Sequence, residues 1–383
     1  NYLGTDKLTA AEVKQQFYKL ACNMNVGVGS DAINISLSGL SENMPEALAL
    51  LEDVLANAKV DQNAYDQYVD LILKDREDAK KDQRTCFDYL YYYAVYGPHN
   101  MRRDDMTAEQ LRQTNPQVFT DLLKNISRYE HTVLYYGPLS EKELSDVIGK
   151  YHKTEKKLAA TPQGQPFAMQ LTPSNEIWIA PYEAKNIYMR MFHNEGRAWN
   201  PEKQGITTLF NEYYGGGMNG IVFQELREAR GLAYNAYAIY SRPGRTGETE
   251  SFFTHIITQN DKMMDCVRQF HEILNNMPQS EAAFQIAKDA AIKQIASQRT
   301  TKFSILNAYI NAQRLGLDYD IYKKIYDLLP SLRLQDIVDF EQQNMGHKPY
   351  RYIILGDEKE LDMDAIGKIA PVKRLTLEEI FGY

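Results

Sequence analysis

The sequence predicts an α+β protein made of two tandem copies of one domain, the first copy lacking its leading strands. Segments recur along the chain at a fixed spacing, and each copy mixes strand-like and helix-like apolar patterns. The length of 383 residues, with 44% hydrophobic and 25% charged residues, suits two ordinary globular domains.

The repeat is clearest near the end of each copy. The segments "HTVLYYGPLSEKELSDVIGKY" (131–151) and "PYRYIILGDEKELDMDAIGKI" (349–369) share an apolar strand pattern, a glycine, an acidic opening and Ile-Gly-Lys, at an offset of 218 (148 to 366). Nearly the same offset pairs two further blocks, 115–126 with 334–345 and 35–55 with 252–274. Several blocks in one order at one spacing indicate duplication of a domain.

The two copies meet near residue 165. A charged segment rich in Pro, Gln and Gly follows Tyr151 without sustained periodicity, so we place the first domain at 1–165 and the second at 166–383. Residue 1 corresponds to residue 219, which leaves about 172–218 without a counterpart in the first copy. We therefore expect the later part of a longer protein, with an unpaired sheet edge that favours self-association into a homo-oligomer.

The second copy supplies the element predictions. Ile177–Ala180 and the alternating Ile187–His193 are expected to be strands, and a last strand, Tyr350–Leu355, leads into a closing helix. The segments 200–214 and 261–277 have apolar residues at helical spacing. Strands at both ends with helices between them predict a sheet covered by helices.

Composition excludes several classes of function. The net charge of −8 gives no footprint for nucleic acid or an anionic membrane, and no apolar run approaches the roughly 20 residues of a membrane span. The three cysteines, Cys22, Cys86 and Cys266, are far apart and odd in number, which predicts small core residues.

The stretch "GGGMNGIVFQELREARGLAY" (215–234) carries the candidate site. Its glycines precede a predicted helix, Ile221–Ala229, in which Val222, Leu226 and Ala229 share one stripe and Arg227 points roughly 100° away from Leu226. Gly231 is expected to end the helix in the left-handed conformation, with Leu232 and Tyr234 on one face of the extended segment that follows.

This stretch resembles the C-terminal half of the pitrilysin/insulinase family of zinc metallopeptidases, the inverzincins. "LGTDKLTAAEV", "SLSGLSENMPEALALLEDVL" and "VLYYGPLSEKEL" resemble the preceding domain of that half. The resemblance implies a zinc-dependent endopeptidase that closes around a peptide, with Arg227 and Tyr234 binding substrate backbone and the oxyanion. It also places Gly215, Gly216 and Gly217 in the substrate-binding turn.

The zinc is expected in the N-terminal half of the same enzyme or in a separate zinc-bearing subunit. In H-x-x-E-H two histidines stand four apart, whereas none of the seven histidines here is followed by His at that spacing. His271-Glu272 is followed by Asn275 where H-E-x-x-H needs its second His. No metal ligand is therefore predicted in this chain, and the chain alone is predicted to be inactive.

Plainer interpretations remain open. An Arg before a helix-ending glycine suits the helix dipole, a Tyr at a strand start often packs, and three glycines can simply form a strand-to-helix turn or cradle a phosphate. The first copy places Lys14 and Ala21 at the positions of Arg227 and Tyr234, so the fold does not require the pair. The alternative function is a non-catalytic scaffold or partner subunit of the same fold.

Other polar and aromatic groups are weaker candidates. The residues His193, Glu195 and Arg197 are interpreted as a loop rather than a ligand set, and most of the 27 tyrosines as core.

Overall fold

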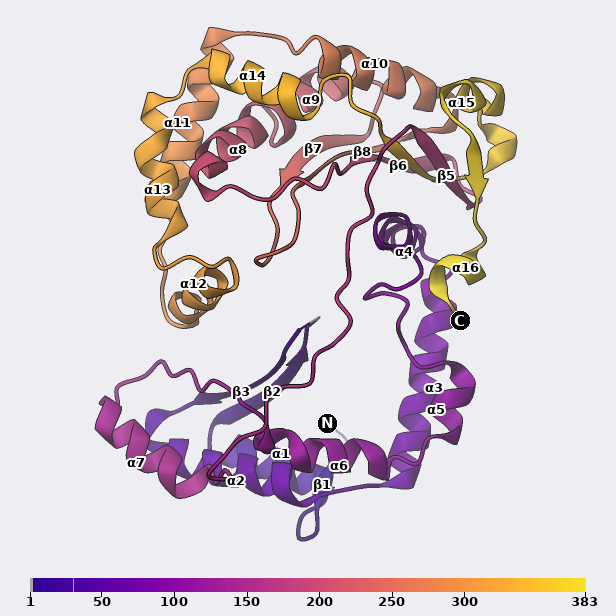
Figure 1. Cartoon of the computed structure of the whole chain (residues 1–383). Helices are drawn as coiled ribbons and strands as arrows, with labels where there is room; N and C mark the ends of the chain where they lie inside the picture. Colours follow the sequence, from indigo (N-terminus) through magenta and orange to yellow (C-terminus); the bar gives the residue numbers. More distant parts are fainter. Residues whose placement is uncertain (1–2, 30) are drawn as a thin grey trace. The chain divides into compact units, whose positions relative to one another are not determined.

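The computed structural model describes residues 3–29 and 31–383, which form two compact units (Figure 1). The first unit comprises the residues up to Asp78 together with Met106–Pro166, and the second comprises Ala79–Asp105 with Phe167–Tyr383. Residues 79–105 therefore do not belong to the first unit, where the sequence placed them. None of the described helices combines the length and the apolar run needed to cross a bilayer.

The first unit consists of helices around short strands. Its helices are α1 (Ala10–Lys19), α2 (Met44–Asn57), α3 (Gln62–Ala79), α5 (Ala108–Gln113), α6 (Gln117–Asn125) and α7 (Glu141–Tyr151). Strands β2 (Cys22–Val28) and β3 (Ile33–Gly39) form an antiparallel hairpin, and β1 (Gly4–Thr5) pairs with β4 (Ala58–Lys59). A small core joins α1, α2 and the hairpin through Val13, Phe17, Cys22, Ala47, Leu51 and Val54.

A predicted strand is missing from the first unit. The apolar residues 131–136 resemble the last strand of the second copy, but they form no strand in the structure. The equivalent strand of the second unit hydrogen-bonds to two neighbours that the described part of the first unit does not contain. An apolar pattern does not form a strand without a backbone to pair with.

The second unit contains a six-stranded mixed sheet in the order β10-β5-β9-β6-β8-β7. The strands are β5 (Glu176–Pro181), β6 (Asn186–His193), β7 (Asn235–Ser241), β8 (Ser251–Gln259), β9 (Arg351–Gly356) and β10 (Val372–Arg374). Strands β10, β5 and β9 run parallel, while β6 is antiparallel to both β9 and β8. All six residues of β9 are buried, as expected of a central strand covered on both faces.

Helices cover both faces of this sheet (Figure 1). One face packs against a long helical layer, α8 (Gln204–Phe210), α9 (Ile221–Phe223), α10 (Met263–Asn275), α11 (Glu281–Ser297), α13 (Ile321–Leu328), α14 (Leu334–Asn344) and α15 (Met363–Ile369). The other face packs against α4 (Gln83–Tyr96) and α16 (Leu377–Phe381). Helix α12 (Phe303–Arg314) has no buried residue.

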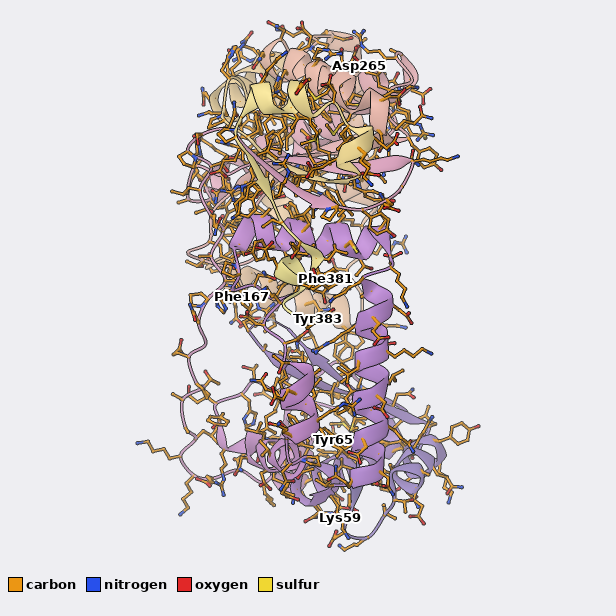
Figure 2. All side chains as sticks on the ribbon, turned by 90° about the vertical axis from the view of Figure 1, so that its right-hand side faces the viewer. Lys59, Tyr65, Phe167, Asp265, Phe381 and Tyr383 are labelled. Atoms are coloured by element: carbon orange, nitrogen blue, oxygen red, sulfur yellow. The ribbon has the colours of Figure 1, made fainter. Side chains whose placement is uncertain are left out.

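Four tyrosines of α4, Tyr89, Tyr91, Tyr93 and Tyr96, pack against this second core. Tyr89 stacks on Phe381 with ring centres 4.0 Å apart, and Tyr383 meets Tyr89 edge-on; Figure 2 labels both C-terminal rings. The guanidinium of Arg190 lies 4.1 Å from the ring centre of Tyr91. The apolar and aromatic face of α4 therefore explains why residues 79–105 join the second unit.

The predicted strands at 177–180, 187–193 and 350–355 are confirmed within a residue or two, as are the helices near 204 and 263. The order of elements also recurs between the units. A short 3₁₀ turn begins at Ser41 and at Asn260, and a long helix begins at Gln62 and at Glu281, both pairs 219 residues apart. By the same count α4 corresponds to α12 (83 to 303, a spacing of 220) and Gly137 to Gly356.

Candidate functional site

The glycine-rich turn of the second unit lies between two segments of π-helix. The first, Asn211–Gly215, extends α8, and the second, Gln224–Glu228, extends α9. The Ala229 amide donates to the carbonyl of Gln224, five residues earlier, at 2.8 Å. π-helical turns are rare, and each inserts one extra residue into a helix. Where they occur, they are frequently found at functional sites.

The glycines of the turn have separate physical roles. Gly215 is buried, and a Cβ atom there would meet the carbonyl oxygen of Ala238 on β7 at 1.9 Å. Gly217 has φ +72° and is exposed, whereas Gly216 is half-buried. Gly215 therefore lets the turn approach the sheet, and Gly216 and Gly217 form its outward part.

Arg227 lies on the exposed side of the second π-helical segment. Its side chain is 47% exposed, and its Nε lies 3.8 Å from a carboxylate oxygen of Glu228. The guanidinium also lies 4.9 Å from the ring centre of Phe223. An ion pair this long and exposed contributes little stability, so most of the donors of Arg227 remain free for a ligand.

The chain then reverses at Gly231 and enters β7. Gly231 has φ +58°, which confirms the predicted left-handed end of the helix, and its amide donates to the carbonyl of Arg227 at 3.0 Å. The Tyr234 amide donates to the carbonyl of Ile257 at 2.8 Å, which fixes the backbone, while the Tyr234 side chain is 78% exposed. Arg227 and Tyr234 are both presented to solvent.

Two details of the predicted stripe were wrong. Ala229 is exposed because the π-helical turn rotates it away from buried Val222 and Leu226. Leu232 is half-buried against the core, whereas Tyr234 is exposed, and residues 231–234 belong to no strand.

The structure also changes which residues of the first unit correspond to the candidate site. Ala21 has φ +49°, so it corresponds to the helix-ending Gly231 and not to Tyr234. Four residues earlier, Phe17 is buried, whereas Arg227 is exposed. The first unit keeps the helix-turn-strand geometry without the Arg, and packing alone therefore does not account for Arg227.

An open pocket of about 440 Å³ lies beside the turn between Arg227 and Tyr234, and it is lined by Arg230, Leu232, Asp265, Arg268, Gln269 and Glu272. Its two arginines are paired with carboxylates, Arg230 with Glu225 at 3.6 Å and Arg268 with Asp265. Sequence reasoning missed both the pocket and the π-helical segments. Residues from α10 complete the pocket, and no local pattern predicts that contact.

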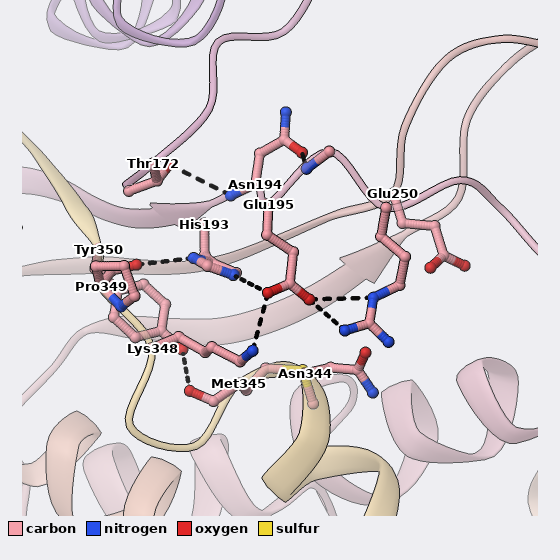
Figure 3. A network of polar contacts seen from close by, with 12 residues as sticks. Thr172, His193, Asn194, Glu195, Glu250, Asn344, Met345, Lys348, Pro349 and Tyr350 are labelled. Carbon is pink, nitrogen blue, oxygen red and sulfur yellow. Dashed lines mark hydrogen bonds and ion pairs between the residues drawn. The ribbon is translucent and has the colours of Figure 1, made fainter. Parts of the chain in front are cut away.

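The polar cluster after β6 is a structural network (Figure 3). His193 Nδ1 lies 2.8 Å from the Pro349 carbonyl, and Glu195 pairs with both Lys348, at 2.9 Å, and Arg197. Burial opposes ionisation of Glu195, but the hydrogen bonds from Lys348 and Arg197 outweigh it and lower the pKa of the carboxyl to about 2. The network ties the loop after β6 to the entry of β9, in agreement with the loop interpretation.

The described residues contain no group of three His, Cys, Asp or Glu side chains that could hold a metal ion. Cys22, Cys86 and Cys266 are buried and unpaired with one another, as predicted for core residues. Burial raises the pKa of the Cys86 and Cys266 thiols to about 11, which keeps them protonated. The residues present do not fit a zinc site.

Comparison with protein families finds that the chain is similar to peptidases. Residues 124–291 match the family model described as the peptidase M16 inactive domain. An uncharacterized zinc protease of Rickettsia bellii is 20% identical over 349 residues, covering 88% of this chain and 81% of the relative. The beta subunit of the mitochondrial-processing peptidase of Neurospora crassa is 24% identical over 162 residues, 42% of this chain and 33% of that subunit.

Solved structures share the fold. The peptidase M16 inactive domain from Pseudomonas fluorescens superposes with a TM-score of 0.67 at 17% identity, covering 92% of this chain and 85% of that domain. A mutant of the ferredoxin protease FusC, solved in complex with Arabidopsis ferredoxin, gives a TM-score of 0.71 at 9% identity over 93% of this chain and 39% of that protein. These matches agree with the α+β class predicted from the sequence.

Proposed function

We propose that the second unit of this chain, which is similar to M16 peptidases of the pitrilysin type, forms the substrate-holding side of a zinc endopeptidase site. Arg227 and Tyr234 bind the backbone of an extended peptide and stabilise the oxyanion. Gly216 and Gly217 form the turn along which the peptide lies. The zinc belongs to an N-terminal half of the same enzyme or to a separate zinc-bearing subunit.

The exposure of two side chains that the fold does not use carries this proposal. Tyr234 is 78% exposed, and the Arg227 side chain is 47% exposed beside a glycine turn held tightly to the sheet. The backbones of both residues are fixed by hydrogen bonds at 2.8–3.0 Å. A rigid backbone that presents free donors is suited to binding, because little conformational freedom is lost when the ligand arrives.

The chemistry of the pair fits a peptide substrate. A guanidinium offers a planar fork of N–H donors and no acceptor, and a phenol offers one O–H donor. Both match the carbonyl oxygens of a peptide backbone and the negative charge that develops on a carbonyl oxygen when it is attacked. Because neither group contacts the side chains of the substrate, this part of the site would accept peptides of many sequences.

Binding by this chain alone tests the proposal without a partner. A photoreactive benzoylphenylalanine replaces Met218, which is 75% exposed in the turn, and the probe is a fluorescein-labelled unstructured peptide of Ala, Gly and Ser. We expect the probe to be captured at 218 and the capture to fall in Arg227→Gln and Tyr234→Phe. The control places the photoreactive group at Tyr322, which is 43% exposed on α13. Equal capture at 218 and 322, unchanged by the two variants, would exclude the proposal.

A scaffold or partner-subunit role is the second candidate. The match to a family model described as an inactive domain favours it. In that role Arg227 and Tyr234 would contact a partner protein rather than substrate. Peptide cleavage by the assembled enzyme distinguishes the two candidates. Tyr234→Phe lowers the cleavage rate only if this chain takes part in catalysis.

A further inference from the structure

Two histidines of the first unit face each other closely. The Nε2 atoms of His131 and His152 lie 2.8 Å apart, although the two residues stand 21 positions apart in the chain. Their ring planes are nearly perpendicular, at 86°, with ring centres 5.0 Å apart. Because His152 directly follows the last residue of α7, this contact joins residue 131 to the C-terminal end of that helix.

The other nitrogen of each ring is held by a group that accepts a hydrogen bond. His152 Nδ1 lies 2.7 Å from a carboxylate oxygen of Glu52 on α2, and His131 Nδ1 lies 2.6 Å from the carbonyl oxygen of Tyr129. Carbonyl and ionised carboxylate oxygens have no proton to donate, so each Nδ1 carries the single proton of its neutral ring. Both Nε2 atoms are then bare, and their lone pairs face each other.

This arrangement is the one that metal-binding histidines adopt. A histidine that binds a metal ion through one nitrogen almost always donates its other N–H to a carboxylate or a backbone carbonyl, which fixes the ring. His152 has the carboxylate partner and His131 has the carbonyl partner. Two bare nitrogens this close repel each other unless they share a cation.

The separation of the two nitrogens indicates which class of metal ion fits. Imidazole nitrogens bind divalent metal ions at about 2.0 Å. Two such bonds at a right angle, as in a square-planar or tetragonal ion, place the nitrogens about 2.8 Å apart, whereas the tetrahedral angle of zinc requires about 3.3 Å. The observed 2.8 Å matches the first value. His131 is exposed, so its ring has room to tilt until both lone pairs point at one ion.

We propose that His131 and His152 form a two-histidine site for a divalent transition-metal ion of tetragonal geometry, Cu²⁺ in preference to Ni²⁺, and that Glu52 orients His152. Cu²⁺ stands at the top of the affinity order of divalent ions for nitrogen ligands. Water fills the remaining positions, because the described residues supply no third His, Cys, Asp or Glu ligand. The bound ion ties residue 131 and the end of α7 to α2, and it therefore stabilises the first unit.

The charges around the pair suit a cation. Glu52 supplies a negative charge next to His152. Of the basic residues near the pair in the chain, Arg128 pairs with Glu155 at 3.5 Å, and Lys153 donates to the carbonyl of Gly149. The site involves neither side chain of the proposed peptide-binding pair, so it stands independently of the proposed function.

Copper binding by the full chain, prepared without an affinity tag, tests the site. Isothermal titration with Cu²⁺ should give one ion per chain, and electron paramagnetic resonance of that ion should show two imidazole nitrogens. Both His131→Ala and His152→Ala should weaken Cu²⁺ binding by about tenfold or more, because each removes one of two protein ligands. His347→Asn is the control, since His347 is exposed in the second unit and its φ of +55° suits Asn. That variant should bind Cu²⁺ like the parent.

A second pair of variants tests the role of Glu52. Glu52→Ala should weaken Cu²⁺ binding by about tenfold, as loss of the partner that orients a ligand histidine does. Glu46→Ala removes the same charge from an exposed position of the same helix and should leave binding unchanged.

Two results would overturn the proposal. The first is equal Cu²⁺ affinity in the parent and in His131→Ala, which would identify adventitious binding elsewhere. This variant decides the matter even if His152→Ala folds poorly, because His131 is exposed and its loss leaves the core intact. The second is Zn²⁺ binding as tight as Cu²⁺ binding, because the spacing of the nitrogens predicts zinc to be at least about tenfold weaker.

Discussion

A Cβ atom on Gly215 would lie 1.9 Å from the carbonyl oxygen of Ala238, closer than any two such atoms approach in a folded protein. The turn that precedes Arg227 can therefore pack closely against β7 only because residue 215 is a glycine. A methyl group there must push the backbone of the turn away from the sheet, because the atom it meets belongs to the backbone of a strand that is paired along its length with β8.

Gly215→Ala should accordingly destabilise the second unit by about 1–3 kcal/mol or more, as at overpacked core positions. Thermal denaturation followed by circular dichroism measures the change. Gly367→Ala is the matched control, because a Cβ there meets nothing within 4 Å and the residue lies in α15. That variant should be neutral or stabilising by up to about 1 kcal/mol. Equal melting temperatures for both variants would contradict the close approach.

Tyr234→Phe tests the catalytic half of the proposed function. In the enzyme assembled with its zinc-bearing half, the loss of one hydroxyl should lower kcat/KM by roughly 10²-fold, because the donor acts mainly on the transition state. The melting temperature should not change, because the side chain is 78% exposed. Parent-like cleavage rates would support the scaffold role.

Arg227 should tolerate Lys poorly. Arg227→Ala removes the N–H donors of the guanidinium and also its contact with Phe223. Arg227→Lys restores a positive charge but not the planar guanidinium. We expect kcat/KM of Arg227→Lys to remain within about tenfold of Arg227→Ala. Full recovery by Lys would show that only a positive charge is needed.

The purified chain should hold no stoichiometric zinc. Its described residues contain no cluster of three metal-ligating side chains, and its buried thiols are held protonated. Metal analysis after dialysis against micromolar zinc should give far less than one equivalent, and the chain alone should cleave no peptide. One tightly held zinc, with proteolysis that a chelator stops, would contradict this prediction.

Stability should fall as pH rises because of Glu341. This residue of α14 is 1% exposed, its Oε1 has no hydrogen-bond partner, and burial raises the pKa of the carboxyl from 4.5 to about 8. Between these two values the folded chain binds a proton that the unfolded chain has released. The free energy of unfolding therefore decreases from about pH 4.5 to 8, by on the order of a few kcal/mol.

Glu341→Gln should flatten this decrease, as measured by urea denaturation at several pH values. Glu195→Gln is the control. The pKa of Glu195 lies at about 2 in the folded chain, so its stabilising contribution is present above its ordinary value of 4.5 and is lost below it. The slope between pH 5 and 8 should survive that substitution. A parent-like slope in Glu341→Gln would show that the buried carboxyl does not titrate in this range.

Local patterns predicted the second unit well because its strands have neighbours. Ile187–His193 alternates, pairs on both sides and forms the predicted strand, whereas the equally apolar residues 131–136 do not. A strand depends on partners far away in the sequence, which periodicity does not report. The full superposition of the two units stays a prediction, supported by the near-constant spacing of their elements.

The candidate site was only partly readable from the sequence. Gly231 and the exposed Arg227 follow from helix periodicity and end signals, but the π-helical turns that rotate Ala229 outward have no clear sequence pattern. Residues 79–105 were misplaced for a related reason. Helix propensity identifies α4, but only the tertiary packing of Leu90, Tyr91 and Tyr93 determines which sheet it covers.

The placement of α4 also constrains biosynthesis. This helix ends at Tyr96 and the first strand it covers begins at Glu176, so 79 residues lie between them, and β9 follows only at Arg351. During translation the apolar face of α4 leaves the ribosome long before its sheet exists. A nascent chain with this order exposes the apolar face of α4 for a long stretch of synthesis, and folding of the second unit has to wait until β9 has been made. Such a chain should depend on chaperones that shield apolar segments until release.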